Sequence, residues 1–257
     1  MEILVCVKRV PDTAENEIEV NGSGSDIERG DLVYSVNEWD NYAVEEAIRI
    51  RDDQGGSVTV VTVGDEAAEE VLRREMAMGA DKGIHLCDGA FEGADGKQTA
   101  RLLKAVVEKG GYDLILTGAQ ADGGAGQVGG MLAAMLDYPY ASLVNKIQVN
   151  GSKMEVGREI EGGNQEMNEI KTPCVLSIQT GINEPRYVGI RGIRKVASVD
   201  IPRLGAPDLG AALAAPKVTR EGYFVPELGD GAEMLEGTDE EIIEKLIELL
   251  KAKGGVK

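Results

Sequence analysis

The sequence predicts an α/β fold in which a doubly wound, mostly parallel sheet carries helices on both faces. Short apolar runs, the first from Ile3 to Val7, are typical of strands that are buried on both sides. Segments with apolar residues at helical spacing separate these runs, for example Ala43, Val44, Ala47 and Ile48. Strands that alternate with helices favour parallel pairing through helical crossovers.

The first half of the chain follows this pattern element by element. Strands are predicted at 3–7, 57–63, 84–86 and 113–117. A polar excursion over 14–36 comes before the first helix, which either Asn37 or Asp40 is suited to cap. Further helices are predicted from Asp65 to about residue 80, over 98–109, and from about residue 127.

The second half begins with a different pattern. Strands at 142–149, 153–159, 167–170 and 174–179 predict a small β-hairpin region, with Asn150-Gly151 as a turn. After residue 199 an extended, proline-spaced arm leads to a helix over 238–253, where Thr238 and Glu241 form a capping box. We therefore divide the chain into an α/β domain, 1–199, and an arm, 200–257. The apolar stripe of the last helix is compatible with packing on its own domain or on another subunit.

The composition of the chain excludes several classes of partner and of chemistry. The chain has 27 basic and 45 acidic residues and a net charge of −18, which argues against nucleic acid or an anionic membrane as a partner. With three cysteines and one histidine, no metal site and no nucleophile–base pair can be assembled, so we predict no catalytic residues. The sequence opens with a strand pattern and shows no leader or membrane span, so a cytoplasmic location is expected.

A glycine-rich loop follows the predicted strand at 113–117. Strand, glycine loop and helix is the order that turns free backbone N–H groups toward an anion, with help from the helix dipole. The loop lacks the Gly-Lys-Ser/Thr ending of a Walker A motif, because Gly129-Gly130-Met131 stands there. It predicts a phosphate site, with a flexible surface loop as the alternative. In doubly wound sheets ligands bind beyond the carboxyl ends of the strands, where 6–8, 37–40 and 63–64 also converge.

Residues 183–195 form a second informative segment, predicted as a loop. It combines Tyr187 and Ile190 with Arg186, Arg191 and Arg194. An apolar tip among cations suits docking of an acidic partner, with charge for steering and the tip as anchor. The alternative is an ordinary loop whose Ile and Tyr side chains fold into the core.

These segments also carry a family resemblance. The runs at 5–12, 43–47, 76–81, 158–163 and 183–187, together with Asn37 and the glycine loop, resemble the β subunit of electron-transfer flavoproteins over nearly the whole chain. The resemblance implies a Rossmann-like, adenine-nucleotide-binding fold. It also implies a heterodimer in which the α subunit holds most of the FAD, the β subunit binds AMP, and the arm docks on the α subunit.

The resemblance further implies site residues. Those expected to bind the cofactor are Cys6, Asn37, Glu38, Trp39, Asp40, Val63, Gly118, Ala119, Gln120, Ala121, Asp122, Gly123, Gly124, Ala125, Gly126, Gln127 and Val128. Those expected to dock an acyl-CoA dehydrogenase are Tyr187, Ile190, Arg191 and Arg194, and Glu159 is expected to contact the flavin domain.

The implied function is that of an electron carrier that passes electrons from acyl-CoA dehydrogenases, in fatty acid oxidation, to a quinone-linked oxidoreductase. An alternative within the family is an electron-bifurcating form, whose β subunit binds a second FAD in place of AMP and oxidises NADH. An alternative of another class is a stand-alone adenine-nucleotide-binding regulatory protein.

Overall fold

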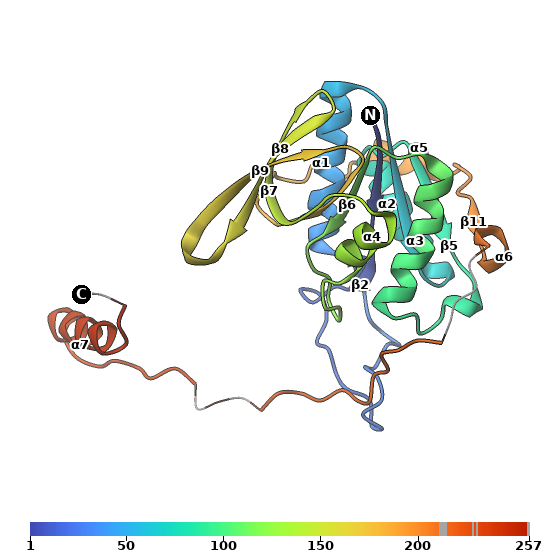
Figure 1. The fold of residues 1–257 in the computed structure, drawn as a ribbon. Helices are drawn as coiled ribbons and strands as arrows, with labels where there is room; N and C mark the ends of the chain where they lie inside the picture. Colours follow the sequence, from blue (N-terminus) through green and yellow to red (C-terminus); the bar gives the residue numbers. More distant parts are fainter. Residues whose placement is uncertain (211–214, 228, 230, 256–257) are drawn as a thin grey trace.

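A wide, mostly parallel sheet forms the centre of the molecule (Figure 1). The computed structural model describes residues 1–210, 215–227, 229 and 231–255. Within these residues the sheet has nine strands in the order β11-β5-β4-β1-β6-β10-β7-β8-β9. Their bounds are β1 Glu2–Cys6, β4 Ser57–Val63, β5 Lys82–Leu86, β6 Leu114–Gly118, β7 Tyr140–Asn150, β8 Lys153–Ile160, β9 Asn164–Lys171, β10 Cys174–Ile178 and β11 Arg203–Leu204. A separate antiparallel pair is formed by β2 (Arg9–Pro11) and β3 (Tyr34–Val36).

Helices pack on both faces of the sheet, as predicted. One core cluster joins apolar side chains of α1 (Glu38–Gln54), α2 (Glu69–Met78) and α5 (Ile190–Val196) to one face. A second cluster joins α3 (Gly96–Gly110), α4 (Val128–Leu136) and α6 (Ala206–Leu209) to the other. In the described residues, the remaining helices are η1 Glu66–Ala68, η2 Gly89–Phe91, η3 Glu161–Gly163 and α7 Asp239–Ala252. The doubly wound fold class is confirmed.

Strand β1 begins with Glu2, but its three central residues are all apolar. Ile3 and Val5 belong to the cluster under α1 and α2, whereas Leu4 belongs to the cluster under α3 and α4. All three side chains are fully buried. Successive side chains of a strand point to opposite faces, and both faces are covered at these three positions, so all three must be apolar.

The strand order reverses at β1, which lies between β4 and β6 with both neighbours parallel to it. The chain moves from β1 through β4 to β5 on one side, and from β6 to β10 on the other. The carboxyl ends of β1, β4 and β6 therefore open at the same edge. This is the edge at which doubly wound sheets bind their ligands.

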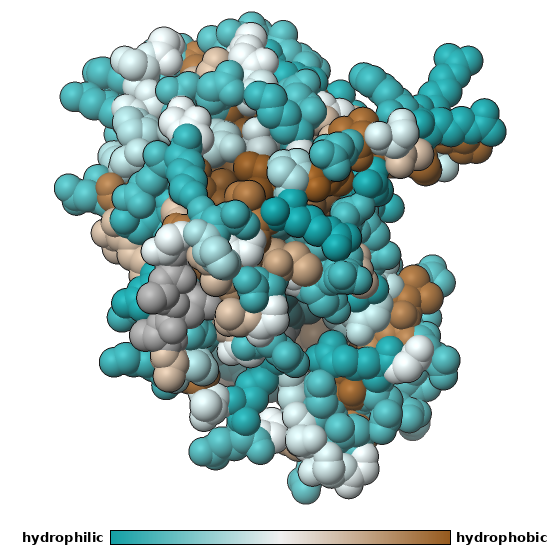
Figure 2. Space-filling view, turned by 90° about the vertical axis from the view of Figure 1, so that its right-hand side faces the viewer, coloured by the Kyte–Doolittle hydropathy of each residue, from teal (hydrophilic) through white to brown (hydrophobic). Residues whose placement is uncertain are grey.

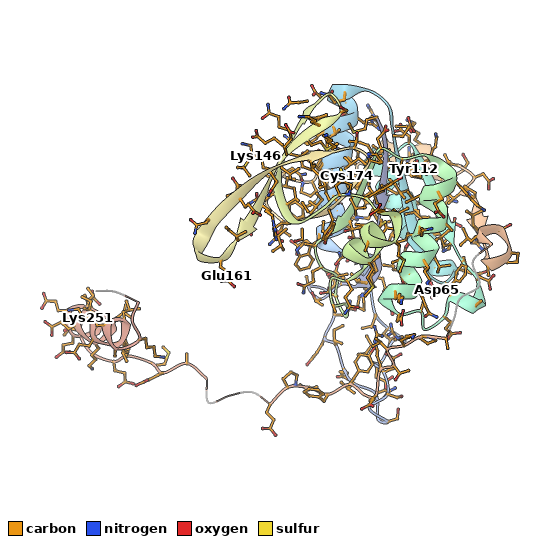
Figure 3. All side chains as sticks on the ribbon, viewed as in Figure 1. Asp65, Tyr112, Lys146, Glu161, Cys174 and Lys251 are labelled. Carbon is orange, nitrogen blue, oxygen red and sulfur yellow. The ribbon has the colours of Figure 1, made fainter. Side chains whose placement is uncertain are left out.

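The antiparallel part contains the predicted hairpin in a slightly different register. Asn150 pairs with Lys153 at the end of the ladder, so the two-residue turn is Gly151-Ser152 rather than Asn150-Gly151. Gly151 has a φ of 67°, which glycine adopts without steric cost. Strands β8 and β9 continue as a second hairpin that projects from the body, with Glu161 at its tip (Figure 3).

Two other local predictions were wrong. Residues 190–196 form helix α5 and not a loop, because Gly192 lets the segment pack directly on α2: a Cβ at Gly192 would lie 2.3 Å from the carbonyl oxygen of Ala77. At the start of α1, Asn37 occupies the N-cap position but makes no side-chain capping bond, and Asp40 lies inside the helix. Both side chains bond to other segments instead.

The first part of the C-terminal region packs on the body, and the later part extends away from it. Strand β11 pairs with β5, and Ile201 and Leu209 are buried, so the first residues of the predicted arm lie on the sheet. From residue 215 the described chain is extended, and α7, marked by Lys251, stands away from the body (Figures 1 and 3). Thr238 and Glu241 form the predicted capping box. The apolar side chains of α7 are largely exposed, Ile243 by 55%.

The surface reflects the charge of the chain. The face shown in Figure 2 is mostly hydrophilic, with smaller hydrophobic areas set among polar side chains. Within the described ranges, none of the helices is both long and apolar enough to cross a lipid bilayer.

Candidate functional site

A buried carboxylate connects three of the segments that end at the ligand-binding edge. Oδ1 of Asp40 accepts the backbone N–H of Gly118 at 2.9 Å, and Oδ2 accepts the N–H of Lys8 at 2.9 Å. Burial raises the pKa of Asp40 to about 7, while hydrogen bonds from Asn37, Gly118 and Lys8 act in the opposite direction. Asp40 thus anchors the start of α1 to the end of β6 and to the segment after β1.

Gly118 is the residue that permits this approach. A Cβ at Gly118 would lie 2.4 Å from Oδ1 of Asp40 and 2.7 Å from Cβ of Trp39. Because real side chains do not come so close, any other residue at this position would push α1 away from the sheet. Ala119, the next residue, donates its N–H to the carbonyl oxygen of Ile178 at 2.8 Å, which fixes the start of the glycine loop.

Asn37 also connects these segments by hydrogen bonds, and its side chain has an acceptor atom without a partner. It is fully buried, and its Nδ2 donates to the carbonyl oxygen of Gln120 at 2.9 Å. Its backbone N–H donates to the carbonyl oxygen of Lys8 at 2.9 Å. The Oδ1 atom of Asn37 has no hydrogen-bond partner, and neither does Oγ1 of buried Thr62, which comes just before Val63 at the end of β4. Buried acceptors without partners are costly, so these atoms are suited to a ligand.

The glycine loop is shaped by backbone conformations that favour glycine. Gly123 and Gly126 have φ values of 66° and 61°, and a Cβ at Gly126 would lie 2.8 Å from the carbonyl oxygen of Ala119. Side chains from 122 to 127 are exposed. Helix α4 begins at Val128 without a side-chain cap, which leaves its first N–H groups available to an anion.

One glycine at the start of α4 has a packing role instead. A Cβ at Gly129 would lie 2.5 Å from Oγ of Ser177 and 2.8 Å from Oγ1 of Thr117. These two hydroxyls hydrogen-bond to each other at 2.8 Å. Gly129 therefore brings α4 onto β6 and β10, and it is a steric requirement rather than part of a phosphate cradle.

Two cations contact the loop. Nζ of Lys8 donates to the carbonyl oxygen of Asp122 at 2.8 Å, and Nη2 of Arg220 donates to that of Gly123 at 3.2 Å. Sequence reasoning placed Lys8 near the site without a role, and it missed Arg220. No local pattern marks Arg220, because it lies in the extended arm, 97 residues after the glycine that it contacts.

A polar chain leads from this site to the antiparallel strands. Nε1 of Trp39 donates to Oε1 of Gln179 at 3.0 Å, and Nε2 of Gln179 donates to Oε2 of Glu159 at 3.3 Å. Nδ2 of Asn145 donates to Oε1 of the same glutamate at 3.0 Å. Gln179 and Asn145 were not predicted. They join Trp39, predicted to bind the cofactor, to Glu159, predicted to contact the flavin domain.

The structure places the other predicted residues at the same edge. Cys6 and Val63 end β1 and β4, and both are half-buried. Burial, with a smaller contribution from Asp40, raises the pKa of the Cys6 thiol, so a reactive thiolate is not favoured there. Glu38 is exposed at the first position of α1.

The 183–195 segment is held on α1 by buried carboxylates. Nε and Nη2 of Arg186 donate to the two carboxylate oxygens of Glu45 at 2.8 and 2.9 Å, and Nδ2 of Asn183 donates to Glu46 at 2.9 Å. Arg186 is therefore a structural clamp. Tyr187 and Ile190 are 92% and 68% exposed, which rules out the alternative that they fold into the core. Arg191 and Arg194 are exposed as well.

Comparison with known proteins shows to which family this chain belongs. The chain matches the Electron transfer flavoprotein domain over residues 26–209. It is 36% identical to the electron transfer flavoprotein subunit beta of Methylophilus methylotrophus, over 97% of this chain and 98% of that protein. It is 37% identical to the subunit beta of Thermoanaerobacterium thermosaccharolyticum, over 98% and 99%. The chain belongs to the β-subunit family of electron transfer flavoproteins.

Other members of this electron transfer flavoprotein family have more specific names. The chain is 36% identical to the caffeyl-CoA reductase-Etf complex subunit CarD of Acetobacterium woodii, over 98% of this chain and 99% of that protein. It is 34% identical to the acryloyl-CoA reductase electron transfer subunit gamma of Anaerotignum propionicum, over 98% and 99%. Family membership is therefore shared by proteins named for different complexes.

Proposed function

We propose that this chain is the β subunit of a heterodimeric electron carrier that holds AMP at the glycine loop. The observation that carries the proposal is the Asp40 anchor, which joins α1, the segment after β1 and the end of β6 around one edge of the sheet. It assembles the loop, the free start of α4 and the unpaired Oδ1 of Asn37 into one site. The loop and the start of α4 suit the phosphate of a nucleotide, and the Oδ1 acceptor of Asn37 suits a hydrogen-bond donor on its base.

In this proposal the chain supports the FAD without contributing acid–base chemistry. FAD, held mainly by the α subunit, supplies the electron-transfer chemistry when bound. Glu159 is oriented by Gln179 and Asn145 near the end of β8, two residues before the hairpin tip at Glu161. Around it, Ile160, Met167 and Leu143 are exposed, by 43%, 43% and 38%. Exposed apolar side chains beside an oriented carboxylate suit contact with the flavin domain.

The proposed partner-docking surface is Tyr187, Ile190, Arg191 and Arg194. Because Arg186 and Asn183 fix the segment to α1, Ile190 is presented from a rigid support. An exposed aliphatic anchor flanked by arginines suits a partner with an acidic rim and an apolar pocket. We propose an acyl-CoA dehydrogenase as electron donor and a quinone-linked oxidoreductase as acceptor.

A second candidate is the electron-bifurcating form, with a second FAD in place of AMP and NADH as electron donor. The relatives named for caffeyl-CoA and acryloyl-CoA reductase complexes favour it. The stand-alone regulatory protein is disfavoured by the uncovered apolar side chains of α7, which require a partner surface.

The nucleotide content of the αβ complex tests the proposal. The chain should be co-expressed with the α subunit, the complex denatured, and the released nucleotides quantified by chromatography. One FAD and one AMP per heterodimer would support the carrier with AMP, and two FAD would support the bifurcating form. A heterodimer with a single FAD and no other nucleotide would contradict both.

A further inference from the structure

The C-terminal arm crosses the glycine loop on its way out of the body. The backbone N–H of Lys217 donates to Oδ2 of Asp95 at 2.8 Å, beside the start of α3. Arg220 then contacts Gly123, and the N–H of Tyr223 donates to the carbonyl oxygen of Gly24 at 2.7 Å. Figure 1 shows the arm (orange) passing the 14–36 segment (blue) at the lower end of the body. These contacts hold residues 217–223 across three separate segments.

Within this crossing, Arg220 is fixed and faces a second cation. Its Nη1 donates to the hydroxyl of Tyr223 at 2.7 Å, which orients the guanidinium toward the loop. Arg220 and Lys8 contact the carbonyl oxygens of consecutive residues, Gly123 and Asp122. Burial is the main reason that the pKa of Lys8 is lowered, and the charge of Arg220 lowers it further, against opposing contributions from Asp40 and Asp122.

Some cations of this acidic chain form ion pairs with carboxylates, whereas others, such as the exposed Arg191 and Arg194, form none in the described residues. Arg51, Arg73, Arg186 and Arg203 each pair with a carboxylate. In the part of the chain that the structure describes, neither Lys8 nor Arg220 forms such an ion pair. Asp40 and Asp122 partly offset the charge of Lys8, and the charge of Arg220 acts on Asp26. The two cations still repel each other, and one anion at the loop would offset both charges. A phosphate at the loop would provide that anion.

We propose that Lys8 and Arg220 form a two-cation clamp for the phosphate of the bound adenine nucleotide, so that the site is complete only when the arm lies across the glycine loop. This inference rests on the nucleotide-binding function proposed above. Coupling between two sites is reciprocal, so the bound phosphate in turn stabilises the arm in this position. The clamp thereby links nucleotide occupancy to the position of the arm that carries α7.

Comparing the binding of AMP with that of adenosine isolates the contribution of the phosphate group to affinity. The full-length chain, in complex with its α subunit and freed of the β-bound nucleotide, should be titrated with each compound by calorimetry at low salt. Arg220→Gln should weaken AMP binding about tenfold or more, because a charge-assisted hydrogen bond to phosphate is lost. Adenosine binding should change less than about twofold. Lys8→Gln should behave like Arg220→Gln. Lys217→Gln is the matched control, because it removes a charge from the arm but keeps the backbone contact.

Protection of the arm from proteolysis tests the reverse effect, in which bound AMP stabilises the arm. AMP should slow chymotrypsin cleavage at exposed Phe224 in the wild-type chain but not in Arg220→Gln, and adenosine should have no effect in either. Equal weakening of AMP and adenosine by Arg220→Gln would overturn the clamp and leave a purely structural contact, and unchanged AMP binding would overturn it too. A wild-type chain that binds neither compound would overturn the nucleotide proposal and the clamp together.

Discussion

Asp40 accepts the backbone N–H of Gly118 at 2.9 Å, and this bond fixes helix α1 to the strand end from which the glycine loop starts. Since Asp40 also holds Lys8, one carboxylate sets the spacing of three segments that are far apart in sequence. This edge of the sheet and the two surfaces proposed to meet partners give four testable predictions, and the buried Glu75 of α2 gives a fifth.

Asp40→Ala should reduce both stability and nucleotide retention. It leaves the N–H groups of Gly118 and Lys8 without acceptors, which should lower the free energy of unfolding by about 2 to 4 kcal/mol. Urea denaturation and quantification of the retained nucleotide measure the two effects. Asp31→Ala, at an exposed position of the 14–36 segment, is the control. If Asp40→Ala retained as much nucleotide as Asp31→Ala, the anchor would not organise the site.

Gly126→Val should remove the nucleotide while the sheet stays folded. The left-handed φ of Gly126 and the nearby carbonyl oxygen of Ala119 exclude a branched side chain, so the loop must change shape. Circular dichroism checks the fold, and heat release of the bound nucleotide checks occupancy. Gly30→Val should retain full occupancy, since a Cβ there meets no atom within 4 Å. Full occupancy in Gly126→Val would refute the phosphate role of the loop.

Glu75 should make stability depend on pH. Its carboxylate is fully buried without a hydrogen-bond partner, and burial raises its pKa from 4.5 to about 8. Between these values the folded chain keeps a proton that the unfolded chain has lost, so the contribution of Glu75 to stability falls as pH rises from about 4.5 to 8.

Urea midpoints at pH 5, 6.5 and 8 test this dependence. Glu75→Gln should flatten the decline relative to wild type, whereas Glu92→Gln, at an exposed position, should leave it unchanged. Parallel declines in the wild type and Glu75→Gln would show that Glu75 does not titrate in this range.

Ile190→Ala should raise the apparent KM for an acyl-CoA dehydrogenase partner. Truncation of an interface anchor costs on the order of 2 kcal/mol, or about thirtyfold in affinity. Arg191→Gln should instead flatten the salt dependence of association, because rim charges act mainly on encounter. Stopped-flow reduction at two ionic strengths separates the two effects. Val218→Ala, an equally exposed apolar position on the arm, is the control; a matching loss there would mean that Ile190 has no special role.

The arm should be sensitive to proteolysis in the isolated chain and protected by the α subunit. Helix α7 exposes Ile243, Leu246 and Leu250, which need a partner surface to become buried. Limited trypsin digestion followed by mass spectrometry gives the cleavage rate after Lys245, with Lys104 on α3 as an internal reference. Equal rates for Lys245 with and without the α subunit would exclude docking of α7 on that subunit.

The sequence by itself determined the elements that bury apolar residues. The runs that became β1, β4 and β6 and the helical stripes of α1 and α3 were read correctly, because their periodicity records which faces are covered. The glycine loop was located for a similar reason, since strand, glycines and helix are adjacent along the chain. Capping by Asp65 and Thr238 was also predictable, because each side chain bonds to a backbone N–H three residues ahead.

Only the tertiary structure decided how the candidate site is held together. Helix α5 was missed because Ile190 and Ile193 are exposed, so no buried stripe marks it, and its packing depends on Gly192 meeting α2. Asp40 resembled a cap but bonds to Gly118, 78 residues away, and Trp39 bonds to Gln179, 140 residues away. Local patterns report burial and short-range hydrogen bonds, whereas pairs this distant in sequence meet only because the parallel strands end at one edge.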